Sequence, residues 1–92
     1  MATFTLYQWG TVTRSGEPVG PPTRSTANAF DSALQLASGT VYFKVVPDVD
    51  AYFLLSNDGT AATSADGKII GTFGTSANIA PGSRPYVYLT AA

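Results

Sequence analysis

The sequence predicts an all-β protein, a small antiparallel β-sandwich or barrel of six to seven short strands with an extended N-terminal arm. The chain has 92 residues, and two separate cores of half that size would each bury too little surface to fold unaided. Apolar residues alternate with polar ones at a period near two rather than 3.6. Turn residues interrupt these runs about every 10 residues, which is typical of small β-sandwiches.

Residues 1–22 are predicted to form an N-terminal arm and linker, and residues 23–92 a β-sandwich domain. The stretch 15–26 holds three prolines and two glycines, which favour turns or polyproline II structure. A linker of this kind would separate the arm from the domain.

The arm itself reads as an extended segment. Phe4 and Leu6 would lie on one of its faces, and Tyr7 and Trp9 on the other. Such large apolar side chains must be buried, either on the arm's own domain or on a neighbouring chain. The sequence leaves both alternatives open.

The middle of the chain contains the clearest strand. Residues 27–37 allow a strand or a short helix, and their alternation favours a strand. Residues 40–46 are β-branched and aromatic, and the alternation resumes over residues 49–56. Pro47 and Asp48 interrupt the pattern between them, so we expect a hairpin that turns at these two residues.

The C-terminal part predicts two more strands. An Asn-Asp-Gly turn opens a polar loop that ends at residue 67. A short strand follows over residues 68–73, where Gly71 indicates a bulge or a close backbone contact. Residues 74–78 are expected to be a loop, and residues 85–90 form the last strand.

The charged residues exclude several classes of function. Five Lys and Arg oppose six Asp and Glu, and the scattered cations predict no nucleic-acid binding. The chain has no Cys and no His, which removes thiolate nucleophiles, zinc–thiolate sites and the commonest general base. We therefore predict a protein that is not an enzyme and has no cofactor.

The acidic residues are explained as turn formers. Asp58 and Asp66 each precede a glycine, and Asp48 and Asp50 lie beside the predicted turn. Their spacing matches no EF-hand loop. The sequence also gives no sign that two of them are held at a fixed distance across a cleft, as a glycosidase requires. We predict no bound metal.

The N-terminal segment has neither the basic start nor the apolar run of a signal peptide. No stretch approaches the roughly 20 apolar residues of a membrane span. We expect a protein made in the cytoplasm that does not associate with membranes.

The strands over residues 40–46 and 49–56 are apolar on both faces. This pattern predicts either a homo-oligomer or docking on a larger surface, unless both strands lie at the centre of the sandwich. The candidate partner-binding residues are the aromatic and apolar side chains Phe4, Leu6, Tyr7, Trp9, Tyr42, Tyr52, Tyr86 and Tyr88.

Half of the chain also resembles a known class of protein. The run TVYFKVVPDVDAYFLLSNDGTAATSADG, followed by a strand and then IAPGSRPYVYL, is similar to small virion proteins of tailed bacteriophages. The resemblance covers residues 40–89 and consists of strand patterns and turn residues.

The resemblance implies a capsid decoration, or cement, protein. Such a protein would bind the major capsid protein on the capsid exterior, as a homotrimer, and stabilise contacts between capsid subunits. A tail or head-tail adaptor subunit is an alternative with the same fold class. A receptor-binding or carbohydrate-binding module of a phage fibre is another.

Overall fold

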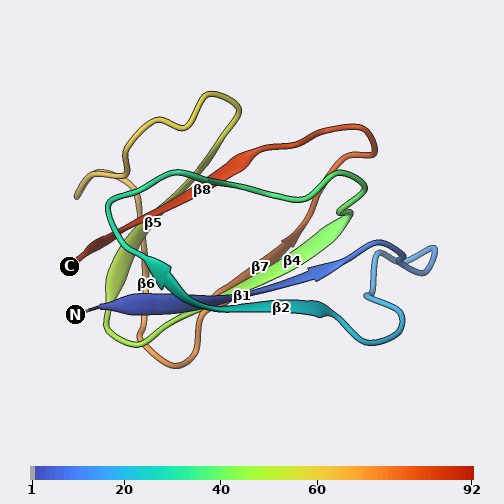
Figure 1. Cartoon of the computed structure of the whole chain (residues 1–92), viewed down its shortest axis with the longest axis horizontal. Coiled ribbons are helices and arrows are strands. Elements are labelled where there is room, and N and C mark those ends of the chain that lie inside the picture. The colour runs from blue at the N-terminus through green and yellow to red at the C-terminus, as the bar shows by residue number, and fades with distance from the viewer. Residues whose placement is uncertain (1) are drawn as a thin grey trace.

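The computed structural model describes residues 2–92 and shows two antiparallel sheets packed face to face (Figure 1). The strand orders are β2-β1-β4-β7 in the first sheet and β3-β8-β5-β6 in the second. This arrangement confirms the predicted all-β sandwich. Its eight strands within residues 2–92 are β1 (Thr3–Trp9), β2 (Thr23–Ala29), β3 (Leu34–Gln35), β4 (Tyr42–Pro47), β5 (Ala51–Ser56), β6 (Gly67–Ile69), β7 (Thr75–Asn78) and β8 (Tyr86–Ala91).

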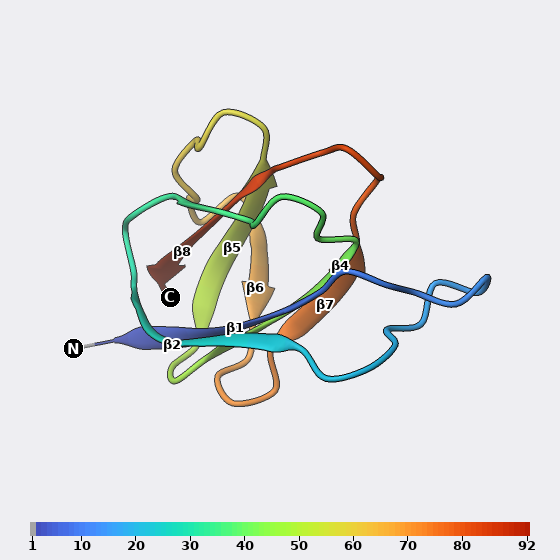
Figure 2. The same ribbon diagram turned by 45° about the vertical axis from the view of Figure 1, so that its right-hand side comes forward.

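The predicted N-terminal arm is instead an inner strand of the first sheet. β1 pairs with β2 on one side and β4 on the other, and Phe4 and Leu6 are buried in the core. The prediction of an arm was wrong because the proline-rich stretch is not a linker between separate parts. Residues 10–22 are the loop of the β1–β2 hairpin, which extends beyond the end of the sandwich (Figures 1 and 2). Met1, the first residue of the predicted arm, lies outside the described residues.

The predicted hairpin at Pro47 and Asp48 does not form. β4 pairs with β1 and β7, whereas β5 pairs with β6 and β8, so the turn carries the chain from one sheet to the other. This connection lets the apolar faces of both strands meet. The rings of Phe43 on β4 and Phe53 on β5 lie 6.1 Å apart across the core. Asp48 connects the turn to the start of β1, because its carboxylate accepts a hydrogen bond from the backbone N–H of Thr3 and its own N–H donates to the Thr3 carbonyl.

Two further segments differ from their predicted structure. Residues 75–78, expected to be a loop, form β7, because β4 offers them a backbone partner that no local pattern reveals. The strand expected over residues 68–73 is confined to β6, and residues 70–74 turn the chain back to the first sheet. Residues 27–37 contain the end of β2 and the short β3, so the strand alternative holds there in part.

The inward faces of the strands follow the predicted alternation. Phe43 and Val45 on β4 and Val87 and Leu89 on β8 are completely buried. The core cluster comprises Phe4, Leu6, Leu36, Phe43, Val45, Ala51, Ile79, Val87 and Leu89.

The loop of residues 57–66 folds back over the outer face of the second sheet (Figure 1). Ala62 in this loop is buried, at 7% exposure. Gly59 approaches so closely that an added Cβ would lie 3.2 Å from Ala33 and 3.7 Å from the ring of Tyr86. The chain therefore covers part of this face itself.

We expect protonation of Asp58 to loosen the start of this loop. Hydrogen bonds from the hydroxyl and the backbone N–H of Thr60 hold the pKa of the Asp58 carboxyl below its usual 3.8. Because the folded pKa is lowered, the stabilisation is complete above the unfolded pKa and is lost as the pH falls through the folded one. In a titration followed by NMR, Thr60→Val should raise the pKa of Asp58 towards 3.8. An unchanged pKa would contradict this assignment.

Candidate functional site

The structure divides the eight predicted partner-binding residues into three groups. Phe4 and Leu6 are core residues, only 2% and 1% exposed, and cannot contact a partner. The prediction that these two residues bind a partner is therefore wrong. β1 is an inner strand, and the side of it that carries Phe4 and Leu6 packs against the second sheet. The other six are half-buried and lie on the two opposite outer faces of the sandwich: Tyr7, Trp9 and Tyr42 on the first sheet, and Tyr52, Tyr86 and Tyr88 on the second.

The outward side chains of β1 and β4 form an aromatic cluster, which we name the β1–β4 face. Trp9 stands directly opposite Tyr42, and their rings meet edge to face at 5.4 Å. Tyr7, two residues before Trp9, has its ring 6.3 Å from the indole at an angle of 29°. Sequence alternation placed these rings on one side of each strand, but only the pairing of β1 with β4 brings them together.

The polar atoms of Trp9 and Tyr42 on this face form hydrogen bonds with other groups of the chain. The indole N–H of Trp9 donates to the carbonyl of Gly20 at 3.0 Å, and the Tyr42 hydroxyl lies 2.9 Å from that of Ser76. The amide of Asn78 donates to the carbonyl of Gly16 at 2.8 Å. The hairpin loop of residues 10–22 is thereby tied to the edge of the β1–β4 face.

Two cations complete the β1–β4 face. Arg24 on β2 and Lys44 on β4 are both direct cross-strand partners of Tyr7, one on each side. Both are exposed. The sequence showed them only as scattered basic residues, because they are 20 positions apart along the chain and become neighbours through β1.

The outer face of the second sheet carries Tyr52, Tyr86, Tyr88 and Leu54. Tyr88 and Leu54 are direct cross-strand partners, and Tyr52 pairs with Thr90 on the next row. All four apolar side chains are half-buried. The loop of residues 57–66 covers part of this outer face, because Gly59 lies against the ring of Tyr86.

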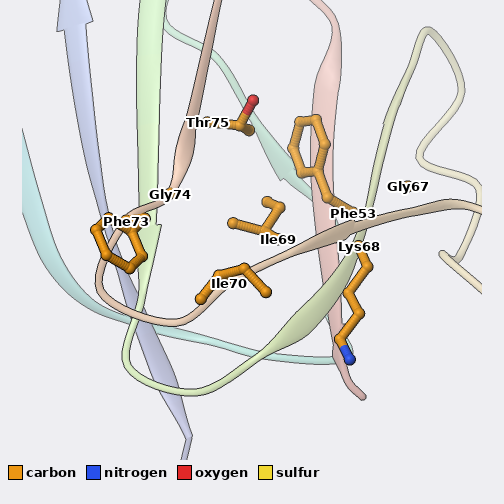
Figure 3. A pocket seen from close by; sticks show the side chains of 8 residues that line it. All are labelled: Phe53, Gly67, Lys68, Ile69, Ile70, Phe73, Gly74 and Thr75. Carbon is orange, nitrogen blue, oxygen red and sulfur yellow. The ribbon is translucent and has the colours of Figure 1, made fainter.

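A third surface lies at one edge of the sandwich, between the two sheets. The sequence did not predict it as a site. β6 is the last strand of the second sheet and β7 the last strand of the first. Between them lies a crevice of about 330 Å³. We name it the edge crevice, and its lining residues are Phe53, Gly67, Lys68, Ile69, Ile70, Phe73, Gly74 and Thr75 (Figure 3).

Two apolar side chains stand exposed at the edge crevice. Phe73 is 76% exposed and Ile70 is 51% exposed, the two highest values among the large apolar side chains of residues 2–92. Lys68 points away from the other side chains that line the crevice (Figure 3). The sequence signal for this surface was the apolar run KIIGTF, but that run predicts a short strand interrupted by Gly71 and not an exposed apolar turn.

Comparisons with models of known protein families, with curated proteins and with solved structures found no match to this chain. Residues 2–92 contain no helix with the length and apolarity needed to span a membrane. No three acidic side chains in the described part of the chain gather closely enough to hold a metal ion.

Proposed function

We propose that this chain is a non-enzymatic structural protein of a tailed-phage virion. It binds the outer surface of the capsid, contacts the major capsid protein and stabilises contacts between capsid subunits, as a homotrimer. The resemblance of residues 40–89 to small phage virion proteins supports the choice of partner. The edge crevice, with Phe73 exposed beside it, is the observation that supports docking on a protein surface.

An exposed phenylalanine is unfavourable for a chain that stays alone in water. Full burial of such a ring contributes about 1.5–3 kcal/mol, and large aromatic anchors dominate the energy of many protein interfaces. Ile70 adds a second exposed apolar side chain next to Phe73. A capsid subunit that covers both would gain this free energy at the edge of the sandwich.

The two strands beside the crevice also offer backbone hydrogen bonds to a partner. β6 and β7 each pair with one strand only, so each leaves one row of backbone groups without a partner in its sheet. A strand of a capsid subunit can pair with such an edge through main-chain hydrogen bonds. Stable attachment needs about 1,000 Å² of buried surface, so the crevice would lie at the centre of a larger contact.

We expect Phe73→Ser to weaken capsid attachment strongly. The variant removes the exposed ring but no core side chain, so the protein should stay folded, as judged by circular dichroism. Val19→Ser is the matched control, because Val19 is 46% exposed on the distant hairpin loop. Co-sedimentation with empty capsids of the virus that encodes the chain should show pelleting of the wild type and of Val19→Ser only.

Two results would contradict the proposal. If the wild-type protein does not pellet with capsids, the capsid is not the partner. If Phe73→Ser pellets like the wild type, the edge crevice is not the docking surface. Light scattering on the purified protein measures its mass, and a trimer is the expected species.

A further inference from the structure

We propose that the β1–β4 face binds an anionic polysaccharide in which acidic and neutral sugars alternate. The central residue is Tyr7, whose ring points out from the middle of the first sheet. Arg24 and Lys44 are its direct cross-strand partners on β2 and β4. A line of cation, aromatic ring and cation therefore runs across three neighbouring strands.

The two cations favour a negatively charged occupant. Arg24 and Lys44 are exposed and form no ion pair with the described acidic residues. The ion pair found within residues 2–92 joins Lys68 to Asp50, on the second sheet and the turn that leads into it. An anion at the β1–β4 face would therefore gain attraction without displacing an acidic side chain of the protein.

The spacing favours charges separated by a flat group. Neighbouring strands lie about 4.8 Å apart, so the backbones at Arg24 and Lys44 are about 10 Å apart with Tyr7 between them. In a polysaccharide the sugar rings are links of the main chain. Where acidic and neutral sugars alternate, one neutral ring lies between two carboxylates, and its apolar C–H face can stack on the tyrosine ring.

The same arrangement disfavours two other anionic polymers. In a single-stranded nucleic acid the bases project to one side of the phosphates, so its binding sites pair a row of aromatic rings with a separate row of cations. Here the ring of Tyr7 lies between its two cations instead. A peptide of acidic residues alone, such as polyglutamate, supplies the charges but no flat group to place between them.

Further groups on this face suit a longer chain of sugars. The ring of Trp9 lies 6.3 Å from that of Tyr7, so a second aromatic ring is present on the same face for the next sugar to contact. Ser76 is the cross-strand partner of Lys44, and Asn78 that of Tyr42. Both are exposed. The Ser76 oxygen accepts from the Tyr42 hydroxyl and the Asn78 amide nitrogen donates to Gly16, which leaves the Ser76 O–H and the Asn78 Oδ1 to hydrogen-bond sugar hydroxyls.

Isothermal titration calorimetry on the full-length chain with a hyaluronan oligosaccharide, which alternates acidic and neutral sugars, tests the proposal. Neutral dextran, oligothymidylate and polyglutamate are the comparison ligands. We expect hyaluronan to bind with an affinity that falls as salt is added, and the three comparison ligands to bind at least about tenfold more weakly.

Charge-reversal variants locate the binding. Lys44→Glu and Arg24→Glu should each weaken hyaluronan binding by about tenfold or more. Lys68→Glu is the matched control, because it makes the same charge change at an exposed position of the second sheet, and it should bind like the wild type. Tyr7→Val keeps a strand-favouring residue but removes the ring, and it should also bind weakly.

Four outcomes would overturn the proposal. These are no binding of hyaluronan, tighter binding of oligothymidylate, tighter binding of polyglutamate, or equal weakening by Lys68→Glu and Lys44→Glu. The last would indicate a general charge effect. Because these titrations contain no capsid and leave Phe73 unchanged, their failure is distinct from a failure of the proposed capsid attachment.

Discussion

Replacing Phe43 with alanine is expected to lower the free energy of unfolding by about 3–5 kcal/mol. Its ring is completely buried between the two sheets and packs against that of Phe53. Truncation would leave a cavity in the core, because the strands on both sides are held in register by their neighbours. Urea denaturation followed by circular dichroism measures the loss.

Phe73→Ala is the matched control for this prediction. It removes the same number of atoms from a ring that is 76% exposed, so the free energy of unfolding should change by less than about 0.5 kcal/mol. Similar losses in the two variants would contradict the placement of Phe43 in the core. The contrast also separates the stability of the fold from the docking proposed for Phe73.

Gly74→Ala is expected to destabilise the protein by about 3 kcal/mol or more. The backbone at Gly74 has a φ of 74°, which side-chain-bearing residues rarely adopt. An added Cβ would also overlap with the carbonyl oxygen of Val45 on β4 and lie 3.1 Å from the Cα of Val46. The backbone would have to shift where the chain enters β7, which would disturb the pairing of β7 with β4.

Gly82→Ala separates the cost of the positive φ from the cost of the close contact with β4. Gly82 has a similar φ of 83°, but nothing lies within 4 Å of the position its Cβ would take. This variant should therefore lose only the conformational part, about 1–2 kcal/mol, in the same urea experiment. Equal losses at Gly74 and Gly82 would show that the contact with β4 has no energetic consequence.

The proposed capsid attachment and the proposed polysaccharide binding have separate centres on the molecule, and both extend to β7. The edge crevice lies between β6 and β7, whereas the central line of the β1–β4 face lies on β2, β1 and β4. A protein attached to a capsid by its edge would leave its outer sheet face in contact with solvent. The two proposals are therefore compatible, and each has its own test.

The sequence predicted only part of the candidate surfaces. Alternation within β1, β4 and β8 correctly separated the inward side chains from the outward tyrosines, since a strand places successive residues on opposite faces. It could not show that Phe4 and Leu6 face a second sheet. It also could not predict that Arg24 and Lys44 would lie on either side of Tyr7, because their positions relative to each other depend on which strands pair.

What the sequence by itself determined was the class of the fold, the strands over residues 40–46, 49–56 and 85–90, and the absence of Cys and His chemistry. Period-two patterns and turn residues act over a few positions, and they can be read without knowing the partner of any strand. The tertiary structure alone decided that β1 is an inner strand, that the turn at Pro47 crosses between sheets and that β7 exists. Each of these depends on backbone pairing between segments far apart in the chain, where the free energy of burial outweighs local preference. The edge crevice arises in the same way, because it lies between the last strands of two sheets whose order no local pattern encodes.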